Sequence, residues 1–235
     1  MEKQLRSTEI TQGTERVAHR ALLFAVGLKR SDFSRPMVAI VNSWNEIVPG
    51  CVHLRELAEH VKQGVREAGG VPLEFDTIAV CDGMAQGHVG MSYSLPSRDV
   101  IAASAEIMLQ AHRFDGAVFM SSCDKITPGM FMAAARVNIP SIFVAAGPMA
   151  AGRFRGRKIA LPNTRELAGA YQIGEITAEE LAQAEEEACP TPGTCAMMGT
   201  ANTMACMAEA MGLTYPLSAT TPAISPEKAA DARQA

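Results

Sequence analysis

The chain has 235 residues, of which 48% are hydrophobic and 20% are charged, a composition typical of a folded globular protein rather than a disordered one. Its formal net charge of −4 leaves no basic footprint for a nucleic acid or an anionic membrane surface. No apolar run reaches the ~18 residues of a membrane span, and the polar N-terminus lacks a secretory signal. We therefore expect a cytoplasmic protein without nucleic-acid or membrane partners, whose six cysteines are thiols or metal ligands rather than disulfides.

The first part of the chain alternates predicted helices and strands. The spacing of apolar residues predicts a helix over residues 14–26, with Gly27 as its stop. The apolar run that begins after Pro36 is typical of a buried parallel strand. A second helix is predicted over residues 53–68 and a second buried strand over residues 75–80.

The same alternation continues toward the middle of the chain. A third helix is predicted to be capped by Ser97, and it is followed by a strand over residues 116–122. A short helix over residues 128–137 and a strand over residues 141–147 come next. Alternating strands and helices with right-handed crossovers build a parallel sheet, so the predicted fold class is α/β, a mostly parallel sheet flanked by helices.

The pattern changes beyond Gly152. Residues 152–169 are basic and are predicted to form a surface loop. Two more helices are predicted, over residues 178–188 and 198–211, and the first of them begins with a capping box of Thr177 and Glu180.

A helix start signal stands close to the end of the sequence. The sequence offers Ser225 as an N-cap, Pro226 at the first helical position and Glu227 as an acidic residue of the first turn. Little sequence follows them, and we interpret this as a sign that the chain is cut inside a larger protein.

Reactive side chains gather where the predicted strands end. Ligands of open parallel sheets bind beyond the carboxyl ends of the strands. Three cysteines, Cys51, Cys123 and Cys195, lie beside Gly or Pro turns, whose backbone N–H groups stabilise thiolates. Asp82 and Asp124 offer the hard oxygen ligands that Mg²⁺ prefers. Soft and hard ligands side by side indicate two different metal centres in one site.

Each of these residues also has an ordinary structural interpretation. A single loop cysteine is usually a small buried hydrophobic residue, and no CxxC pair typical of zinc occurs. Asp124 is alternatively a cap of the following helix, and Lys125 a surface ion-pair partner. The residues alone therefore predict an α/β enzyme with a candidate metal site and no more.

Several motifs carry a resemblance to a known family. They are CDG, SCDKITPG and GTC followed by GTANTM, in this order, together with VNSWNEIVPGCVHLREL. With them the chain closely resembles the dihydroxy-acid dehydratase family, within the broader group of sugar-acid dehydratases. The similarity runs from about Arg6 to Gly212.

The resemblance implies a hydro-lyase with an iron–sulfur cluster and a magnesium ion in one active site. A cysteine at position 51 favours a [2Fe–2S] cluster, while [4Fe–4S] stays open. The expected ligands are, for the cluster, Cys51, Cys123 and Cys195 and, for magnesium, Asp82, Asp124 and a carbamate formed on Lys125. The remaining cysteines match no ligand position that we can assign: Cys81, Cys189 and Cys206.

This ligand set fits a dehydration. Three cysteines leave one iron without a protein ligand, and that iron can act as a Lewis acid on the C3 hydroxyl. Magnesium would hold the carboxylate and the C2 hydroxyl of the substrate. The implied substrates are small 2,3-dihydroxy-3-methyl acids on the route to valine and isoleucine, and the implied products are 2-keto acids.

The family also implies what residues 1–235 lack. Its members continue into a second, β-rich domain, which carries the serine that removes the proton and a further glutamate ligand of magnesium. We therefore expect residues 1–235 to be an incomplete N-terminal cluster-binding domain that holds no catalytic base and is inactive alone, and we expect the full-length protein to be a homodimer.

Other functions remain open at this point. A sugar-acid dehydratase that acts on an aldonate or on phosphogluconate would share the same metal ligands. A second alternative, from a different functional class, is a non-catalytic fragment that associates with other subunits, since Met- and Ala-rich surfaces suit association. An iron–sulfur carrier is a third, but Asp82 and Lys125 argue against it because a carrier needs no magnesium.

Overall fold

The computed structural model describes residues 5–235, and a four-stranded parallel sheet forms its centre. The strands are β1 (Met37–Asn42), β2 (Val71–Asp76), β3 (Gly116–Ser121) and β4 (Ser141–Ala145). They lie in the order β2-β1-β3-β4, and every neighbouring pair is parallel. This arrangement confirms the predicted α/β class and brings the carboxyl ends of the strands to one edge of the sheet.

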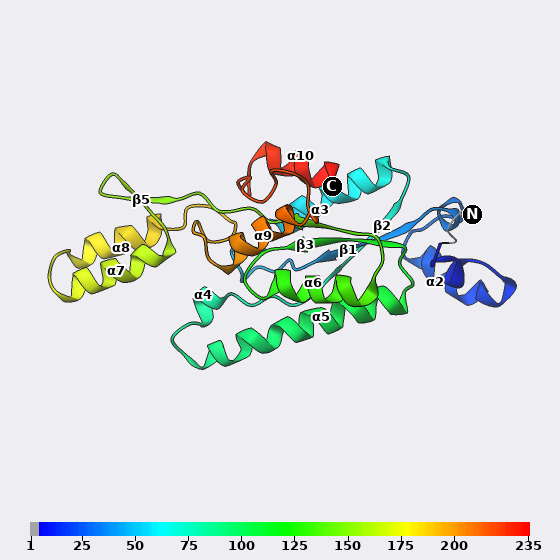
Figure 1. Cartoon of the computed structure of the whole chain (residues 1–235), viewed down its shortest axis with the longest axis horizontal. Helices are drawn as coiled ribbons and strands as arrows, with labels where there is room; N and C mark the ends of the chain where they lie inside the picture. Colours follow the sequence, from blue (N-terminus) through cyan, green and yellow to red (C-terminus); the bar gives the residue numbers. More distant parts are fainter. Residues whose placement is uncertain (1–4) are drawn as a thin grey trace.

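Helices cover both faces of the sheet (Figure 1). The helices α3 (Leu54–Glu67) and α10 (Pro226–Gln234) lie on one face, and α5 (Ser94–Ala111) and α6 (Ile126–Val137) lie on the other. The remaining short helices and turns of the main body are α1 (Thr8–Thr11), η1 (Thr14–Arg16), α2 (Val17–Ala25), η2 (Arg30–Ser34), α4 (Asp82–Ala85), η3 (Val89–Tyr93) and α9 (Thr200–Ala210). None of the helices within residues 5–235 is both long and apolar enough to cross a membrane.

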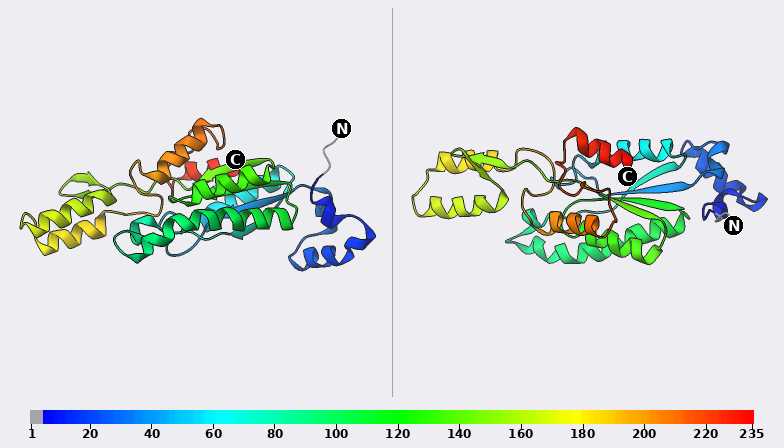
Figure 2. Two further views of the ribbon diagram at one scale, coloured as in Figure 1. Left: turned by 60° about the horizontal axis from the view of Figure 1, so that its bottom comes forward. Right: turned by 45° about the horizontal axis from the view of Figure 1, so that its top comes forward.

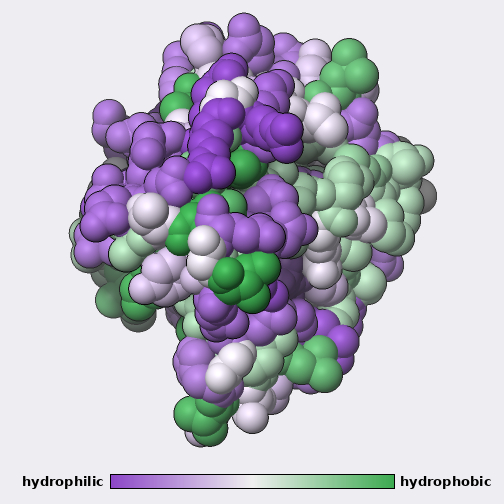
Figure 3. Space-filling model, turned by 90° about the vertical axis from the view of Figure 1, so that its left-hand side faces the viewer, coloured by the Kyte–Doolittle hydropathy of each residue, from purple (hydrophilic) through white to green (hydrophobic). Residues whose placement is uncertain are grey.

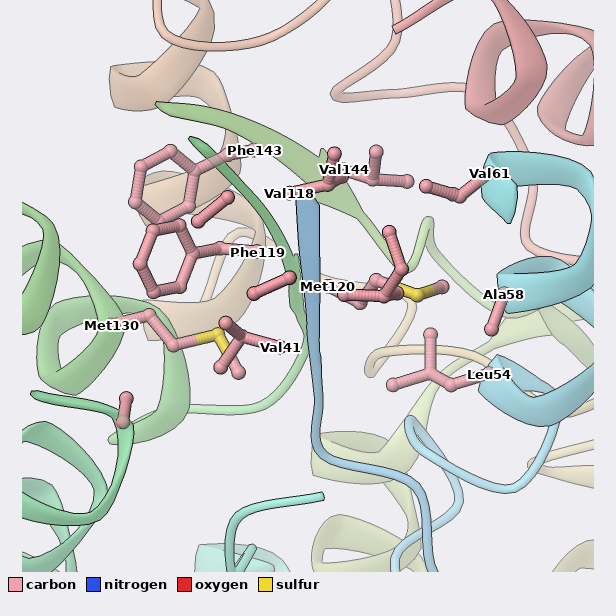
Figure 4. Packing of buried hydrophobic residues seen from close by; sticks show 14 of the residues in the cluster. Val41, Leu54, Ala58, Val61, Val118, Phe119, Met120, Met130, Phe143 and Val144 are labelled. Carbon is pink, nitrogen blue, oxygen red and sulfur yellow. The ribbon is translucent and has the colours of Figure 1, made fainter. Parts of the chain in front are cut away.

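The core is divided between the two faces of the sheet because successive strand residues point to opposite sides. Figure 4 shows Phe119, Phe143 and Met130 together on the α6 side, and Val118 and Met120 on the α3 side. The rings of Phe119 and Phe143 stack at 5.0 Å between centroids. Both side chains are buried, so they anchor the two strands to each other and to α6.

Two predicted boundaries are wrong. The strand expected over residues 75–80 is β2, which begins at Val71, pairs with β1 and ends at Asp76. The helix expected to be capped by Ser97 begins at Ser94 with Tyr93 as its N-cap. The Ser97 hydroxyl lies inside the helix and donates to the Ser94 carbonyl at 2.6 Å. The residues after β2 therefore form a loop that leads to Asp82 at the start of α4.

The prediction of a surface loop over residues 152–169 is also wrong. This segment forms an antiparallel hairpin of β5 (Gly152–Phe154) and β6 (Arg157–Ile159) and most of α7 (Leu161–Gln172). Together with α8 (Ala178–Glu187) it builds a lobe over residues 152–188, which stands apart from the sheet in both views of Figure 2. The lobe has a small core of its own, formed by Phe154, Ile159, Ala184 and Ala188.

The helix signals around the lobe and at the end of the described chain are confirmed. The Thr177 hydroxyl accepts from the Glu180 N–H at 3.2 Å, and the Glu180 carboxylate accepts from the Thr177 N–H at 3.0 Å. The Ser225 hydroxyl caps α10 by accepting from the Lys228 N–H at 3.2 Å. Seen from the tip of the lobe, the surface is mainly hydrophilic with scattered apolar side chains (Figure 3).

The helix α10 brings a buried lysine into the body of the protein. The Lys228 ammonium donates to the Ser218 carbonyl at 2.5 Å and to the Ser218 hydroxyl at 3.2 Å, and its side chain is fully buried. Burial lowers the pKa of Lys228 from 10.5 to about 8. The folded chain therefore releases this proton at a lower pH than the unfolded chain does.

This shift predicts a pH dependence of stability. Between pH 8 and 10.5 the unfolded chain holds a proton that the folded chain has lost, so Lys228 raises the free energy of unfolding with pH, by roughly 3 kcal/mol across the whole window. The buried cysteines have the opposite effect in the same pH range: burial raises their pKa values, so their ionisation lowers the free energy of unfolding as the pH rises. The measurement is therefore the difference in the free energy of unfolding between the unaltered chain and Lys228→Met, determined by urea unfolding at several pH values from 7.5 to 10. Parallel stability curves for the two proteins would contradict the prediction.

Candidate active site

Three loops that carry cysteines meet at the carboxyl edge of the sheet. Cys51 follows β1 and Cys123 follows β3. The Ser122 hydroxyl donates to the Gly50 carbonyl at 2.6 Å, and the Gly193 N–H donates to the Pro49 carbonyl at 3.0 Å. The turn that precedes Cys51 is thus bonded both to the Cys123 loop and to the loop that leads to Cys195.

The Cys195 loop is also fixed to the segment that follows β4 and to α9. The Thr194 N–H donates to the Gly147 carbonyl at 3.0 Å, and the Thr194 carbonyl accepts from the Met149 N–H at 2.8 Å. On the other side, the Asn202 amide of α9 donates to the Cys195 carbonyl at 2.9 Å. Cys195 is therefore held beside the strand ends, although it lies far from them in sequence.

Gly50 allows the close approach of the first two loops. A Cβ atom at this position would lie 2.7 Å from the Cys123 sulfur and would also collide with the Ser122 hydroxyl. No side chain fits between these groups, so this turn requires glycine. The missing Cβ atom therefore lets the backbone of the Cys51 loop lie directly against the Cys123 side chain.

All three thiols are disfavoured as free thiolates. Burial raises the pKa of Cys51 to about 11, and burial also raises the pKa values of Cys123 and Cys195. The pKa of Cys123 is raised further by the neighbouring Cys51. A group of desolvated thiols loses its protons readily only to a bound cation, and sulfur donors prefer soft metals such as iron in clusters. The donor chemistry therefore fits an iron–sulfur cluster.

The two predicted carboxylates form a pair next to these thiols. Asp82 stands at the start of α4, where it accepts from the Lys125 ammonium at 2.5 Å and from the Ser94 hydroxyl at 2.5 Å. Burial opposes its charge, but these two hydrogen bonds, the charge of Lys125 and a hydrogen bond with Asp124 together lower the pKa of Asp82. Burial, together with the charge of Asp82, raises the pKa of Asp124. Two carboxyl groups that compete for ionisation, beside a lysine, fit a hard divalent cation.

The donors are close together, but they are not yet arranged around an ion. Within residues 5–235, no three His, Cys, Asp or Glu side chains are placed so that they could jointly hold a metal. The Lys125 ammonium lies against Asp82, where it balances the carboxylate charge. Asp124 does not cap the following helix, because α6 begins after Lys125 and has no side-chain cap.

A cavity of about 270 Å³ opens among these residues. Four of the six predicted ligands line it: Asp82, Cys123, Asp124 and Cys195. The other two, Cys51 and Lys125, are not among its lining residues. Cys51 is completely buried and raises the pKa of Cys123, and the Lys125 ammonium donates to Asp82.

Other cavity residues carried no functional signal in the sequence. The lobe contributes Leu161, Pro162 and Arg165, and α9 and the turn before it contribute Met197 and Ala201. Cys81 also lines the cavity, although it matches no expected ligand position. Only the tertiary packing of the lobe against the Asp82 turn brings Leu161, Pro162 and Arg165 to the cavity, so a pattern in the sequence could not identify these three residues.

Comparison with known proteins gives consistent matches. Residues 35–235 match the family described as dihydroxy-acid/6-phosphogluconate dehydratase N-terminal. The chain is 52% identical over 231 residues to the dihydroxy-acid dehydratase of Moorella thermoacetica, a match that covers 98% of the chain and 42% of that protein. It is 50% identical over 230 residues to that of Pyrococcus abyssi, with the same two coverages. The similarity to that of Methanobrevibacter smithii is 51% over 217 residues, 92% of the chain and 40% of that protein. The chain therefore spans about two fifths of the length of these curated relatives.

Proposed function

The chain belongs to the dihydroxy-acid/6-phosphogluconate dehydratase family, and from this premise we propose that it is the N-terminal, cofactor-bearing part of a hydro-lyase. The proposed enzyme converts 2,3-dihydroxy-3-methyl acids into 2-keto acids in the biosynthesis of valine and isoleucine. The observation that carries the proposal is the hydrogen-bonded convergence of three cysteine loops beside the Asp82–Asp124 pair.

The proposal assigns each metal centre to a set of residues. The cluster, [2Fe–2S] or [4Fe–4S], would be held by Cys51, Cys123 and Cys195, and Mg²⁺ by Asp82, Asp124 and a carbamate on Lys125. When bound, the two centres supply Lewis acidity toward a departing hydroxyl and a hard binding point for a hydroxy acid. A carbamate would convert the Lys125 cation into an anionic oxygen ligand, which accounts for a lysine next to a metal-binding carboxylate.

The protein residues around the two centres supply binding and shape. The hydroxyl of Ser94 holds one oxygen of Asp82, which fixes how the carboxylate faces the cavity. Apolar side chains, among them Met91, Leu161 and Met197, line much of the rest of the cavity. They suit the branched alkyl end of the proposed substrate and limit the entry of water.

The proposal extends beyond residues 1–235. It includes a β-rich C-terminal domain that provides the proton-abstracting serine, and a homodimeric enzyme in the cytoplasm. Because this base would lie outside the chain, the chain alone is proposed to bind the metal centres without completing the reaction.

A fusion protein tests this function. We would join the chain to the C-terminal part of the Moorella thermoacetica relative, reconstitute it anaerobically with iron, sulfide and Mg²⁺, and measure keto-acid formation from 2,3-dihydroxy-3-methylbutanoate and from gluconate. The fusion should dehydrate the branched acid in preference to gluconate, and the chain alone should form no keto acid. Preference for gluconate would favour a sugar-acid dehydratase, and turnover by the chain alone would contradict the proposed need for a second domain. A fusion inactive on both acids would contradict the hydro-lyase assignment itself.

A further inference from the structure

The lobe places an arginine on the wall of the cavity. Arg165 of α7 lines the cavity, and its guanidinium donates to the side-chain oxygen of Gln86, the residue that follows α4. Close packing holds α7 there, because a Cβ atom on Gly83 would lie 3.3 Å from the Leu161 side chain. Arg165 is therefore attached to the same turn that carries Asp82.

Arg165 differs in its charge environment from the other cations nearby. Within residues 5–235, the charged side chains that line the cavity are Asp82, Asp124 and Arg165. Lys125 is paired with Asp82, and Arg155 of the same lobe is paired with Glu180. Arg165 forms no ion pair with any carboxylate in the described part of the chain; its one side-chain partner there is the neutral Gln86.

This arrangement addresses an electrostatic problem of the cavity. A carbamate on Lys125 would remove the cation that now balances Asp82 and would add a negative group to the two carboxylates, so the site's own charges would then repel an anionic substrate. A guanidinium stays charged at every relevant pH and presents five N–H donors in a planar fork, which matches a carboxylate. Its bond to Gln86 fixes the orientation of the fork and leaves other donors available.

We propose that Arg165 binds the carboxylate of the substrate and so selects anionic ligands for this cavity, an inference that rests on the proposed hydroxy-acid function. The apolar residues of the cavity wall, such as Met197 and Leu161, then receive the alkyl end of the same molecule. A carboxylate has two oxygens, each with more than one acceptor position, so it can bind Arg165 and still meet a hard cation.

Ligand-observed NMR titrations of the chain with 3-methyl-2-oxobutanoate, its uncharged methyl ester and gluconate test this role. The proteins are the unaltered chain, Arg165→Gln, Arg165→Lys and Arg157→Gln. Arg157 is the matched control because it is an exposed arginine of the same lobe that lies outside the cavity. All four are first compared by circular dichroism, to verify that they share one fold.

We expect the keto acid to bind the unaltered chain more tightly than its ester does. Arg165→Gln should raise the Kd of the acid about tenfold, which corresponds to about 1.4 kcal/mol, and should remove its advantage over the ester. Arg165→Lys should give an intermediate Kd because an ammonium cannot form the bidentate contact. Arg157→Gln should bind as the unaltered chain does.

The outcomes separate this inference from the proposed function. Equal Kd values of the acid for the unaltered chain and Arg165→Gln would overturn the role of Arg165 and leave the hydro-lyase proposal standing. Binding of gluconate that depends on Arg165, without binding of the keto acid, would support the role of Arg165 and contradict the branched-chain substrate. The inference would be overturned if the unaltered chain bound the keto acid no more tightly than its methyl ester, or if it bound neither the keto acid nor gluconate.

Discussion

Cys123→Ser is expected to remove most of the iron that the chain takes up during anaerobic reconstitution with iron and sulfide. Cys123 is the central thiol of the candidate site, since it lies against Gly50 and its ionisation is coupled to Cys51, Cys81 and Cys195. A serine oxygen keeps nearly the same shape but is a hard donor that holds cluster iron poorly. Iron and sulfide per chain, together with the visible absorption of the cluster, give the measurement.

Cys206→Ser is the matched control for this experiment. Cys206 lies on α9, packed against Ala145 and Ala219 and outside the lining of the cavity. This variant should retain the iron content of the unaltered chain. Equal iron content in the Cys123 and Cys206 variants would contradict the assignment of the cluster to the three converging loops.

Phe119→Ala is expected to lower the free energy of unfolding by about 3–5 kcal/mol, the usual cost of truncating a buried phenylalanine. The Phe119 side chain is completely buried, and its ring is stacked on Phe143 with an interplanar angle of 14°. The substitution would leave a cavity between β3, β4 and α6, which rigid neighbours cannot fill. Urea unfolding at a fixed pH would show the change as a lower midpoint.

Phe24→Ala provides a comparison with the same change of side chain. Phe24 is 40% exposed on α2, although its ring lies 5.2 Å from that of Phe33. Its truncation should therefore cost much less than that of Phe119. Similar losses at both positions would show that the described packing does not dominate the stability of the chain.

The strands that were predicted correctly are those buried on both faces. The strands β1, β3 and β4 consist almost entirely of apolar residues, and β3 is buried along its whole length. The strand β2 is only partly buried and contains Pro72 and Glu74, so it lacks a continuous apolar run, whereas β4, at the other edge of the sheet, keeps one. The more apolar segment 75–80, which overlaps β2 only at residues 75–76, was mistaken for the strand.

The site was predictable to the extent that it depends on strand ends. Cys123 and Asp124 follow β3 directly, and Cys51 lies in the loop after β1, so topology brings all three to one edge. Of the lobe, α8 was predicted from its capping box, but the hairpin and α7 were not, because the lobe's core is formed by few residues and its hairpin alternates arginine with apolar residues over a short span. The position of Arg165 depends on how that lobe packs against α4, which is information that no local pattern contains.

The bonds that join the cysteine loops have an energetic consequence for mutagenesis. The Ser122 hydroxyl and the Gly193 N–H bind the carbonyl groups of two successive residues, Gly50 and Pro49. Segments more than 70 residues apart in the chain thus restrain two successive peptide units of the same turn, and the effects of altering them should not be additive. Once either tether is lost, the turn is already partly released, so removing the second should cost less than it does in the intact protein.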